Sequence, residues 1–193
     1  EEVEEMKRIS EAMCIPCRDG GLCEEFDGYF KLEDKVIDDS GNLRPVKLNQ
    51  LGLSNVEATQ LVKQADVVLA QLMLRVVGYK YPGDLAKNYD YYIKRVTHES
   101  SLSMPIYAAV AALIGRWQDA LTLFRESLKV DLENLYGNTQ DGFHVATAGG
   151  LWWAVLHGFL GIRLEDGKIV IPDSAAESVI KVLKYSSLRA QKS

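Results

Sequence analysis

Six segments with helical periodicity follow one another along the chain, and they alternate between two kinds. Three are apolar on almost every side, at residues 56–77, 102–114 and 147–162, and three have a charged face, at residues 2–13, 84–95 and 117–130. A helix that is apolar all round is buried by several neighbours, whereas a helix with a charged face lies at the surface. The alternation therefore predicts an all-α protein of about six helices in two layers, with a simple six-helix bundle as the plainer alternative.

Composition excludes several classes of protein. The 193 residues include 22 Lys and Arg against 27 Asp and Glu, a net charge of −5, and 47% are apolar. These values are typical of a globular domain with a substantial core. Because the chain has no basic cluster, we expect no nucleic-acid partner. The apolar run 104–114 is too short to cross a bilayer and the acidic start does not resemble a signal peptide, so we expect a cytoplasmic protein without a membrane partner.

Irregular segments and a little strand complete the predicted organisation. Residues 18–52 are rich in Gly, Asp and Asn. They predict a long irregular segment, which compact domains usually keep for function. Residues 168–171 follow the turn sequence Asp166-Gly167 and are predicted to form a strand, while residues 179–185 are ambiguous between strand and helix.

Three cysteines, Cys14, Cys17 and Cys23, lie within ten residues. Their odd number does not suggest a disulfide framework. The C-x-x-C formed by the first two follows a predicted helix instead of beginning one, where a redox thiol would be activated. A structural zinc site needs four ligands, and the chain has no second pair of cysteines. We therefore expect reduced thiols without a special role and no metal site, with a redox or metal site as the minor alternative.

Three polar clusters lie within the apolar helices or next to them. They are Lys63-Gln64, residues 97–103, and residues 137–144 together with residues 147–150. Two of the clusters precede a helix, and the free N–H groups of a helix N-terminus attract anions. If these ends converge, the hydroxyls of Ser100 and Ser101 and the charges of Lys63 and His144 would complete a phosphate or oxyanion pocket.

Each cluster also has a purely structural interpretation. A serine before a helix is most often a cap, and an isolated histidine such as His98, His144 or His157 is most often a hydrogen-bonded buried side chain. Lys63 is either a buried ammonium paired with Asp66 or a lysine whose amine reaches solvent. Residue patterns leave these alternatives open.

The same residues resemble glycoside hydrolase family 65, the family of maltose, trehalose and kojibiose phosphorylases. The resemblance runs from near the start of the chain to about Ile171, in several long blocks that occur in order. The blocks are residues 25–30 (EFDGYF), 63–70 (KQADVVLA), 88–92 (NYDYY), 97–103 (THESSLS), 138–146 (NTQDGFHVA), 149–152 (GGLW) and 158–163 (GFLGIR).

The resemblance implies an (α/α)6 barrel, twelve helices in two rings, of which six helices are half. It implies an inverting reaction in which phosphate attacks the anomeric carbon while a carboxylic acid protonates the glycosidic oxygen. It also implies site residues, two that hold the glucosyl unit, Lys63 and Gln64, and five that bind the phosphate or let it approach, Ser100, Ser101, His144, Gly149 and Gly150.

Three departures from the family shape the expectation. The family's acid is a glutamate in an upstream motif without a counterpart here, so we expect no catalytic residue in this chain. After Ile171 the chain lacks the family's Pro-rich strand pattern. Glu99 also stands where the family commonly has Asp. We expect residues 1–166 to form the C-terminal half of the barrel and residues 167–193 to be the remnant of a small C-terminal β domain or a tail.

The sequence thus predicts a fragment of an inverting α-glucoside phosphorylase, which converts a glucose disaccharide and inorganic phosphate into β-glucose 1-phosphate and glucose. Its partners would be the disaccharide, phosphate as co-substrate without a cofactor, the missing N-terminal half of the enzyme and, as an option, a second copy in a homodimer. The fragment alone would be inactive because the acid is missing. The alternatives are a family 65 hydrolase, although the Ser100-Ser101 pair favours phosphate, and a non-catalytic helical binding or scaffold protein.

Overall fold

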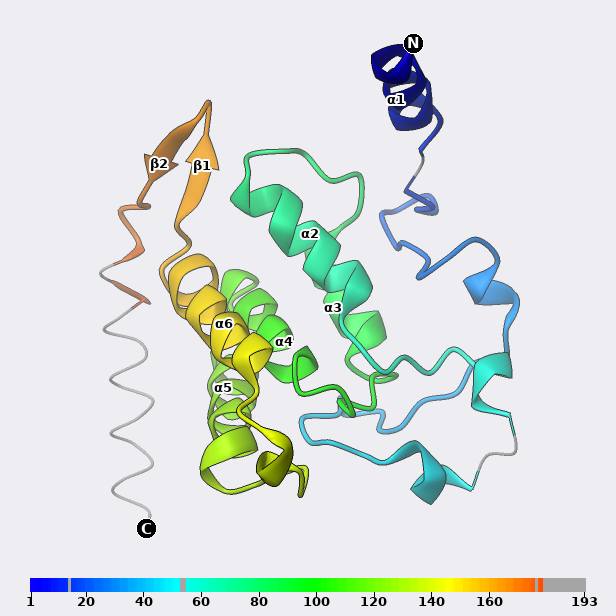
Figure 1. Cartoon of the computed structure of the whole chain (residues 1–193), viewed down its shortest axis with the longest axis vertical. Coiled ribbons are helices and arrows are strands. Elements are labelled where there is room, and N and C mark those ends of the chain that lie inside the picture. The colour runs from blue at the N-terminus through cyan, green and yellow to red at the C-terminus, as the bar shows by residue number, and fades with distance from the viewer. Residues whose placement is uncertain (14, 53–54, 176, 179–193) are drawn as a thin grey trace.

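The computed structural model describes residues 1–13, 15–52, 55–175 and 177–178 (Figure 1). Its helices within these ranges are α1 (Glu2–Ala12), α2 (Asp66–Val76), α3 (Leu85–Tyr92), α4 (Ser103–Leu113), α5 (Trp117–Leu132) and α6 (Val145–Trp153). A hairpin of β1 (Arg163–Glu165) and β2 (Lys168–Val170) follows. The mostly helical fold with a short C-terminal β element is confirmed, and it is consistent with part of an (α/α) barrel.

Helix α4 is the centre of the core. Ten of its eleven residues are buried, including the alanines at 108, 109, 111 and 112. It packs against α5, α6 and the π-helical turn Ala154–Phe159 that continues α6. The approach is close, because a Cβ added at Gly158 would lie 2.6 Å from the Cα of Ala109. Small residues on both sides thus let two backbones meet, and the prediction of an inner helix at 102–114 is confirmed.

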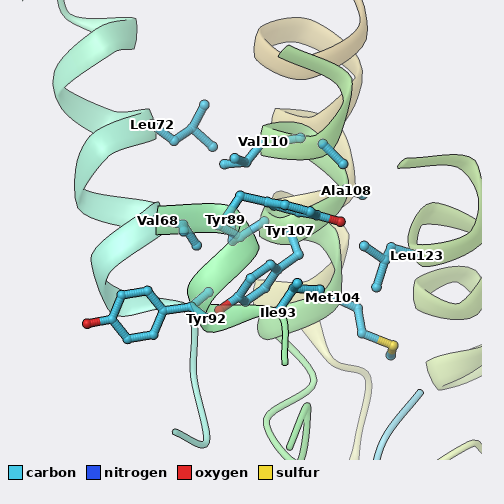
Figure 2. Packing of buried hydrophobic residues seen from close by; sticks show 14 of the residues in the cluster. Val68, Leu72, Tyr89, Tyr92, Ile93, Met104, Tyr107, Ala108, Val110 and Leu123 are labelled. Atoms are coloured by element: carbon cyan, nitrogen blue, oxygen red, sulfur yellow. The ribbon is translucent and has the colours of Figure 1, made fainter. Parts of the chain in front are cut away.

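Tyrosines of α3 join this core to the rest of the molecule (Figure 2). Helix α3 begins where the side chain of Asp84 accepts a hydrogen bond from the N–H of Lys87 (2.9 Å), a helix cap. Tyr89 and Tyr92 are buried; the Tyr89 ring lies 5.8 Å from that of Tyr107 on α4, and the Tyr92 ring 5.8 Å from that of Tyr29. Buried aromatic rings of this size supply much of the apolar area that stabilises a small core.

The first apolar segment is only partly helical, which corrects the prediction of a helix over 56–77. Helix α2 begins at Asp66, and before it the chain forms a 3-10 turn at Val56–Ala58 and then an irregular stretch that contains Val62. Val62 forms a parallel bridge with Val96: its N–H donates to the carbonyl of Arg95 (3.1 Å), and its carbonyl accepts from the N–H of Thr97 (2.8 Å). Pairing with a distant segment therefore replaces the helical hydrogen bonds here.

Helices α1 and α6 are less buried than their sequences predict. In α6 only Thr147 and Gly150 are buried, while Val145 is 72% and Trp152 63% exposed. Helix α1 has the predicted apolar stripe, but no residue of it is buried, and Figure 1 shows it set apart from the other helices. An apolar pattern shows that a face can be buried, and the described residues do not supply neighbours for these two faces.

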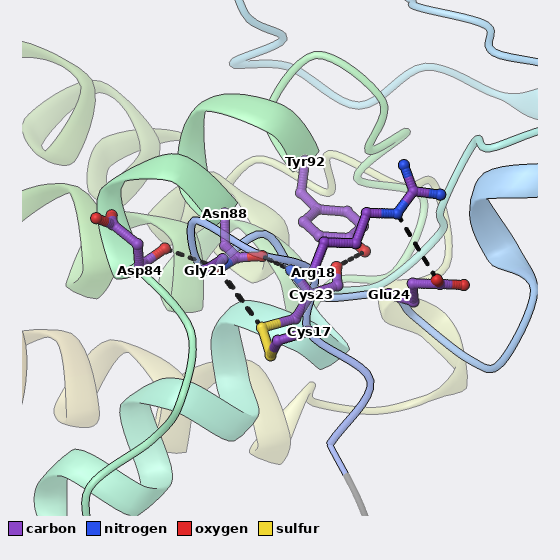
Figure 3. The surroundings of a disulfide bond; sticks show 8 residues. All are labelled: Cys17, Arg18, Gly21, Cys23, Glu24, Asp84, Asn88 and Tyr92. Atoms are coloured by element: carbon purple, nitrogen blue, oxygen red, sulfur yellow. Dashed lines mark hydrogen bonds and ion pairs between the residues drawn. A yellow bond between two sulfur atoms is a disulfide. The ribbon is translucent and has the colours of Figure 1, made fainter.

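A disulfide joins Cys17 to Cys23, so the expectation of reduced thiols is wrong for these two residues. Figure 3 shows how the loop between them rests on the start of α3. The N–H of Cys23 donates to Asn88 Oδ1 (2.9 Å), and Asn88 Nδ2 donates to the carbonyl of Gly21 (2.8 Å). The loop also turns at Gly20 and Gly21, both with positive φ. Cys14 lies outside the described residues.

The C-terminal hairpin confirms the predicted strand at 168–171. Strand β2 pairs with β1 in antiparallel register, with Leu164 opposite Ile169. The connecting residues Asp166 and Gly167 both have positive φ, the requirement of a tight two-residue hairpin turn. Residues 179–185 lie outside the described part of the chain. Among the described residues, none of the helices has the length and apolar character needed to cross a membrane.

Candidate functional site

The bridge between Val62 and Val96 brings two of the three polar clusters together. Lys63 and Gln64 follow Val62 directly, and the segment 97–101 follows Val96. Both clusters therefore begin next to the two bridged residues. Lys63 and Gln64 are exposed and precede α2 instead of lying within it. The interpretation of Lys63 as a lysine whose amine reaches solvent is therefore confirmed over that of a buried ammonium.

Lys63 and Gln64 line an open pocket of about 370 Å³ beneath the irregular segment. Glu25 and Asp66 line the same pocket. Burial, and after it the negative charge of Asp66, raises the pKa of Glu25 to about 8. Asp66, which the sequence offered as a partner for Lys63, thus shares this pocket with an acidic side chain that the residue pattern did not single out.

His98 lies on the other side of the bridge and is completely buried. Its Nε2 lies 2.9 Å from the carbonyl oxygen of Asn42, which can only accept, so Nε2 carries the proton and Nδ1 accepts from the hydroxyl of Ser103 (2.8 Å). Burial lowers its pKa to about 4. With a φ of 51° it also holds a strained left-handed backbone conformation. The structural interpretation of His98 is confirmed.

Ser100 and Ser101 lie in the turn that leads into α4. Both are half-buried, and the carbonyl of Ser100 accepts a hydrogen bond from the N–H of Ser103 (3.0 Å). The strained turn at His98 immediately precedes them, so the closed network around His98 fixes the backbone that carries both hydroxyls. A role of these hydroxyls in binding phosphate stays a prediction.

Tyr136 connects the third cluster to the second. Its hydroxyl lies 2.5 Å from the carbonyl oxygen of His98, and its ring lies 6.5 Å from that of His144. His144 is in turn held by α5, because its Nδ1 lies 2.6 Å from Asp131 Oδ1 and its backbone N–H donates to Asp131 Oδ2 (3.1 Å). This bond leaves Nε2 as the ring nitrogen that can meet a ligand. Tyr136 and Asp131, like Glu25, carried no recognisable signal in the sequence.

The two glycines of α6 differ in their surroundings. A Cβ at Gly150 would lie 2.9 Å from Cγ of Pro105, so this glycine allows α6 to pack on α4. A Cβ at Gly149 would meet nothing within 4 Å. Both line an apolar groove of about 250 Å³ together with side chains of α2 and α4. The geometry of Gly150 is explained by packing, while the predicted approach of phosphate at either glycine is not tested by it.

The remaining histidine, His157, is held by a hydrogen bond to the backbone. His157 lies with Nδ1 2.6 Å from the carbonyl oxygen of Ile162. Within the described part of the chain, no three His, Cys, Asp or Glu side chains are grouped so that they could hold a metal ion.

The layered helices are consistent with part of an (α/α) barrel, and comparison with known proteins gives the family. The sequence model of the glycosyl hydrolase family 65 central catalytic domain matches residues 1–153, so the chain belongs to this family. A solved structure assigned as a kojibiose phosphorylase from the human microbiome superimposes with a TM-score of 0.69 at 27% identity, over 89% of this chain and 23% of that one.

Several curated relatives are named as phosphorylases of glucosides. A kojibiose phosphorylase of Thermoanaerobacter brockii is 39% identical over 86% of this chain and 21% of its own length. An alpha,alpha-trehalose phosphorylase of Geobacillus stearothermophilus is 35% identical over 86% of this chain and 22% of its length. A 3-O-alpha-D-glucosyl-L-rhamnose phosphorylase of Lachnoclostridium phytofermentans is 31% identical over 83% and 21%. The chain thus spans about a fifth of the length of these relatives.

Proposed function

We propose that this chain forms the sugar- and phosphate-binding half of the catalytic barrel of an inverting α-glucoside phosphorylase. The observation that supports the proposal is the bridge between Val62 and Val96, because Lys63 and Gln64 follow one of the bridged residues and the segment that leads to Ser100 and Ser101 follows the other. Tyr136 adds the segment of His144 to this arrangement. The names of the relatives support a phosphorylase, and the substrate would be a disaccharide with a glucosyl unit.

In this proposal the chain binds and orients both substrates. Lys63 and Gln64 hold the glucosyl unit, and the hydroxyls of Ser100 and Ser101 and His144 Nε2 hold the phosphate. An oxygen of phosphate forms a bond to the anomeric carbon as the glycosidic C–O bond breaks, and the leaving oxygen takes a proton from a carboxylic acid. Phosphate is a weak nucleophile, so the contribution of these residues is positioning and the neutralisation of charge.

Several parts of the proposal concern the rest of the enzyme. Coverage of about a fifth of each relative supports a barrel completed by further chain. The general acid would come from that part, so residues 1–193 alone would be inactive. The division at residue 166 into barrel and β remnant, and a homodimer, also stay proposals. A cytoplasmic location is a proposal as well. The disulfide counts against it, because disulfides persist mainly in oxidising compartments.

The test uses the full-length protein that carries this sequence. Incubated with phosphate and kojibiose, trehalose or maltose, it should release β-glucose 1-phosphate from at least one of them. Replacing Ser100 and Ser101 together by Ala should raise the KM for phosphate about tenfold, the loss of one to two hydrogen bonds to an anion, with a smaller change in the KM for the disaccharide. Ser10→Ala in the exposed helix α1 is the control. Release of glucose without glucose 1-phosphate would contradict the proposal.

A further inference from the structure

An acidic side chain of α5 holds His144 at two points. Asp131 Oδ1 lies 2.6 Å from Nδ1 of the His144 ring, and Asp131 Oδ2 accepts a hydrogen bond from the His144 backbone N–H (3.1 Å). Asp131 belongs to the last turn of α5, and His144 stands directly before α6. One carboxylate thus fixes both the ring and the backbone of the residue to which the proposed function gives the phosphate.

The place of Asp131 in α5 is unfavourable for an acid. The C-terminal end of a helix carries free carbonyl groups and the negative end of the helix dipole, which repel a carboxylate. Asp131 is the last residue but one of α5, and because its side chain is only 18% exposed, water screens this repulsion in part. The two N–H groups of His144 compensate it. An acid kept where its helix disfavours it indicates a role beyond the stability of α5.

The contact determines which ring nitrogen of His144 faces a ligand. Carboxylate oxygens only accept hydrogen bonds, so Nδ1 carries a proton and donates to Asp131. Nε2 has no hydrogen-bond partner among the described residues, and the side chain reaches solvent, so this nitrogen is available to an anion. To donate there as well, the ring must carry protons on both nitrogens, and the carboxylate of Asp131 balances the resulting positive charge.

Tyr136 connects this pair to the turn of the two serines. Its hydroxyl lies 2.5 Å from the carbonyl oxygen of His98 and 3.5 Å from that of Ser100. Its ring centre lies 6.5 Å from that of His144, within the range of aromatic contacts. The contacts therefore run without a break from Asp131 through His144 and Tyr136 to Ser100.

We propose that Asp131 is a positioning residue of the phosphate site. It holds the His144 ring so that Nε2 is directed to the phosphate, and its negative charge balances the ring that donates there. The inference rests on the proposed function. Asp131 meets His144 and not the substrate, and so acts only through the histidine. A carboxylate bonded to the ring nitrogen remote from the ligand is a common way to fix the proton and the orientation of a histidine.

Removing the charge of Asp131 in the full-length enzyme tests this role. In Asp131→Asn the amide has one accepting and one donating end, so it cannot accept from both N–H groups of His144. The KM for phosphate should rise about tenfold, the effect of one charge-assisted hydrogen bond. The KM for the disaccharide and the turnover number at saturating phosphate should stay within about threefold, because lost binding of phosphate changes its KM alone.

The matched control is Glu133→Gln. Glu133 is exposed and follows the last residue of α5, so this variant removes a carboxylate from the same helix end without touching the contact to His144. None of the three kinetic values should change in it. A rise in the KM for phosphate equal to that of Asp131→Asn would assign the effect to the general field of the helix end and overturn the inference.

A double variant separates the ring of His144 from its backbone. In His144→Ala the ring is absent, while the backbone N–H can still donate to Asp131. Adding Asp131→Asn to this variant should raise the KM for phosphate no further, because Asp131 acts through the ring. A second rise of about tenfold would show that Asp131 only fixes the start of α6, and it too would overturn the inference.

A conservative variant and a binding measurement complete the test. Asp131→Glu keeps the carboxylate on a longer side chain and should recover most of the phosphate affinity that Asp131→Asn loses. Calorimetric titration of inorganic phosphate measures this affinity without catalysis. An affinity unchanged in Asp131→Asn, or lost equally in Asp131→Glu, overturns the inference. If the wild type releases no glucose 1-phosphate from any disaccharide, the proposed function fails, and the same titration then decides the role of Asp131.

Discussion

Two polar clusters lie on either side of the Val62–Val96 bridge, and they differ in whether their titratable side chains are sealed in the core or line an open pocket. The cluster around His98 is sealed: both ring nitrogens are bonded and the side chain is fully buried. The pair Glu25 and Asp66 lines an open pocket, where burial raises the pKa of Glu25. A buried network whose polar atoms all have hydrogen-bond partners stabilises and specifies the fold. An acid with a raised pKa beside a pocket is typical of a functional site. The bridge thus separates a structural cluster from the one that the proposed function would use.

The largest expected effect comes from opening the sealed cluster. His98→Ala should lower the free energy of unfolding by about 3 kcal/mol, because it leaves the Asn42 carbonyl and the Ser103 hydroxyl without partners and creates a cavity. Urea denaturation measures the change. The matched control is His157→Ala, which removes one half-buried hydrogen bond and should cost about 1 kcal/mol. Equal effects of the two variants would remove the distinction between the sealed cluster and an ordinary hydrogen bond.

The sealed cluster should also show itself in the pH dependence of stability. The folded pKa of His98, about 4, is below the unfolded value of 6.5, so its contribution is complete above pH 6.5 and is lost as pH falls through 4. The folded pKa of Glu25 is raised, so its contribution is complete below 4.5 and is lost as pH rises through 8. Wild type should therefore lose stability toward acid more steeply than His98→Gln, which cannot titrate there.

A smaller effect is expected from the disulfide that precedes Glu25. Closing the short loop between Cys17 and Cys23 limits the unfolded chain, and removing it should cost about 2 kcal/mol in the Cys17→Ser, Cys23→Ser double variant. Wild type treated with a reductant should lose the same amount. An unchanged free energy of unfolding in both the variant and the reduced protein would contradict a stabilising role of this loop.

The smallest effect distinguishes the two glycines of α6. Gly150→Ala should cost about 1 kcal/mol because its methyl group meets Pro105, while Gly149→Ala should gain about 0.5 kcal/mol from the higher helix propensity of alanine. Thermal unfolding measures both. If Gly149 lets phosphate approach, Gly149→Ala should be the variant with the larger effect on phosphate binding in the full-length enzyme. Its KM for phosphate should then be higher than that of Gly150→Ala. An unchanged KM in both variants would limit these glycines to packing.

Much of the fold could be predicted from the sequence, and the errors have a common cause. The helix at 102–114 and the amphipathic helix at 117–130 were located correctly, since their spacing of apolar residues is a local property. The segment 56–77 was misread because the part of it before α2 pairs with Val96, a partner far along the chain. The disulfide was missed because only the turn at Gly20 and Gly21 brings Cys17 and Cys23 together.

Sequence by itself determined the family and the positions of most helices, because long blocks of residues and helical periodicity are readable without a partner. It also identified Lys63, Gln64, Ser100, Ser101 and His144 as candidates. Only the tertiary structure decided which of these lie together and which acid changes its ionisation. Glu25 and Asp66 are separate in the sequence, and the pKa of a carboxyl group is set by burial and by the charges that folding brings to it.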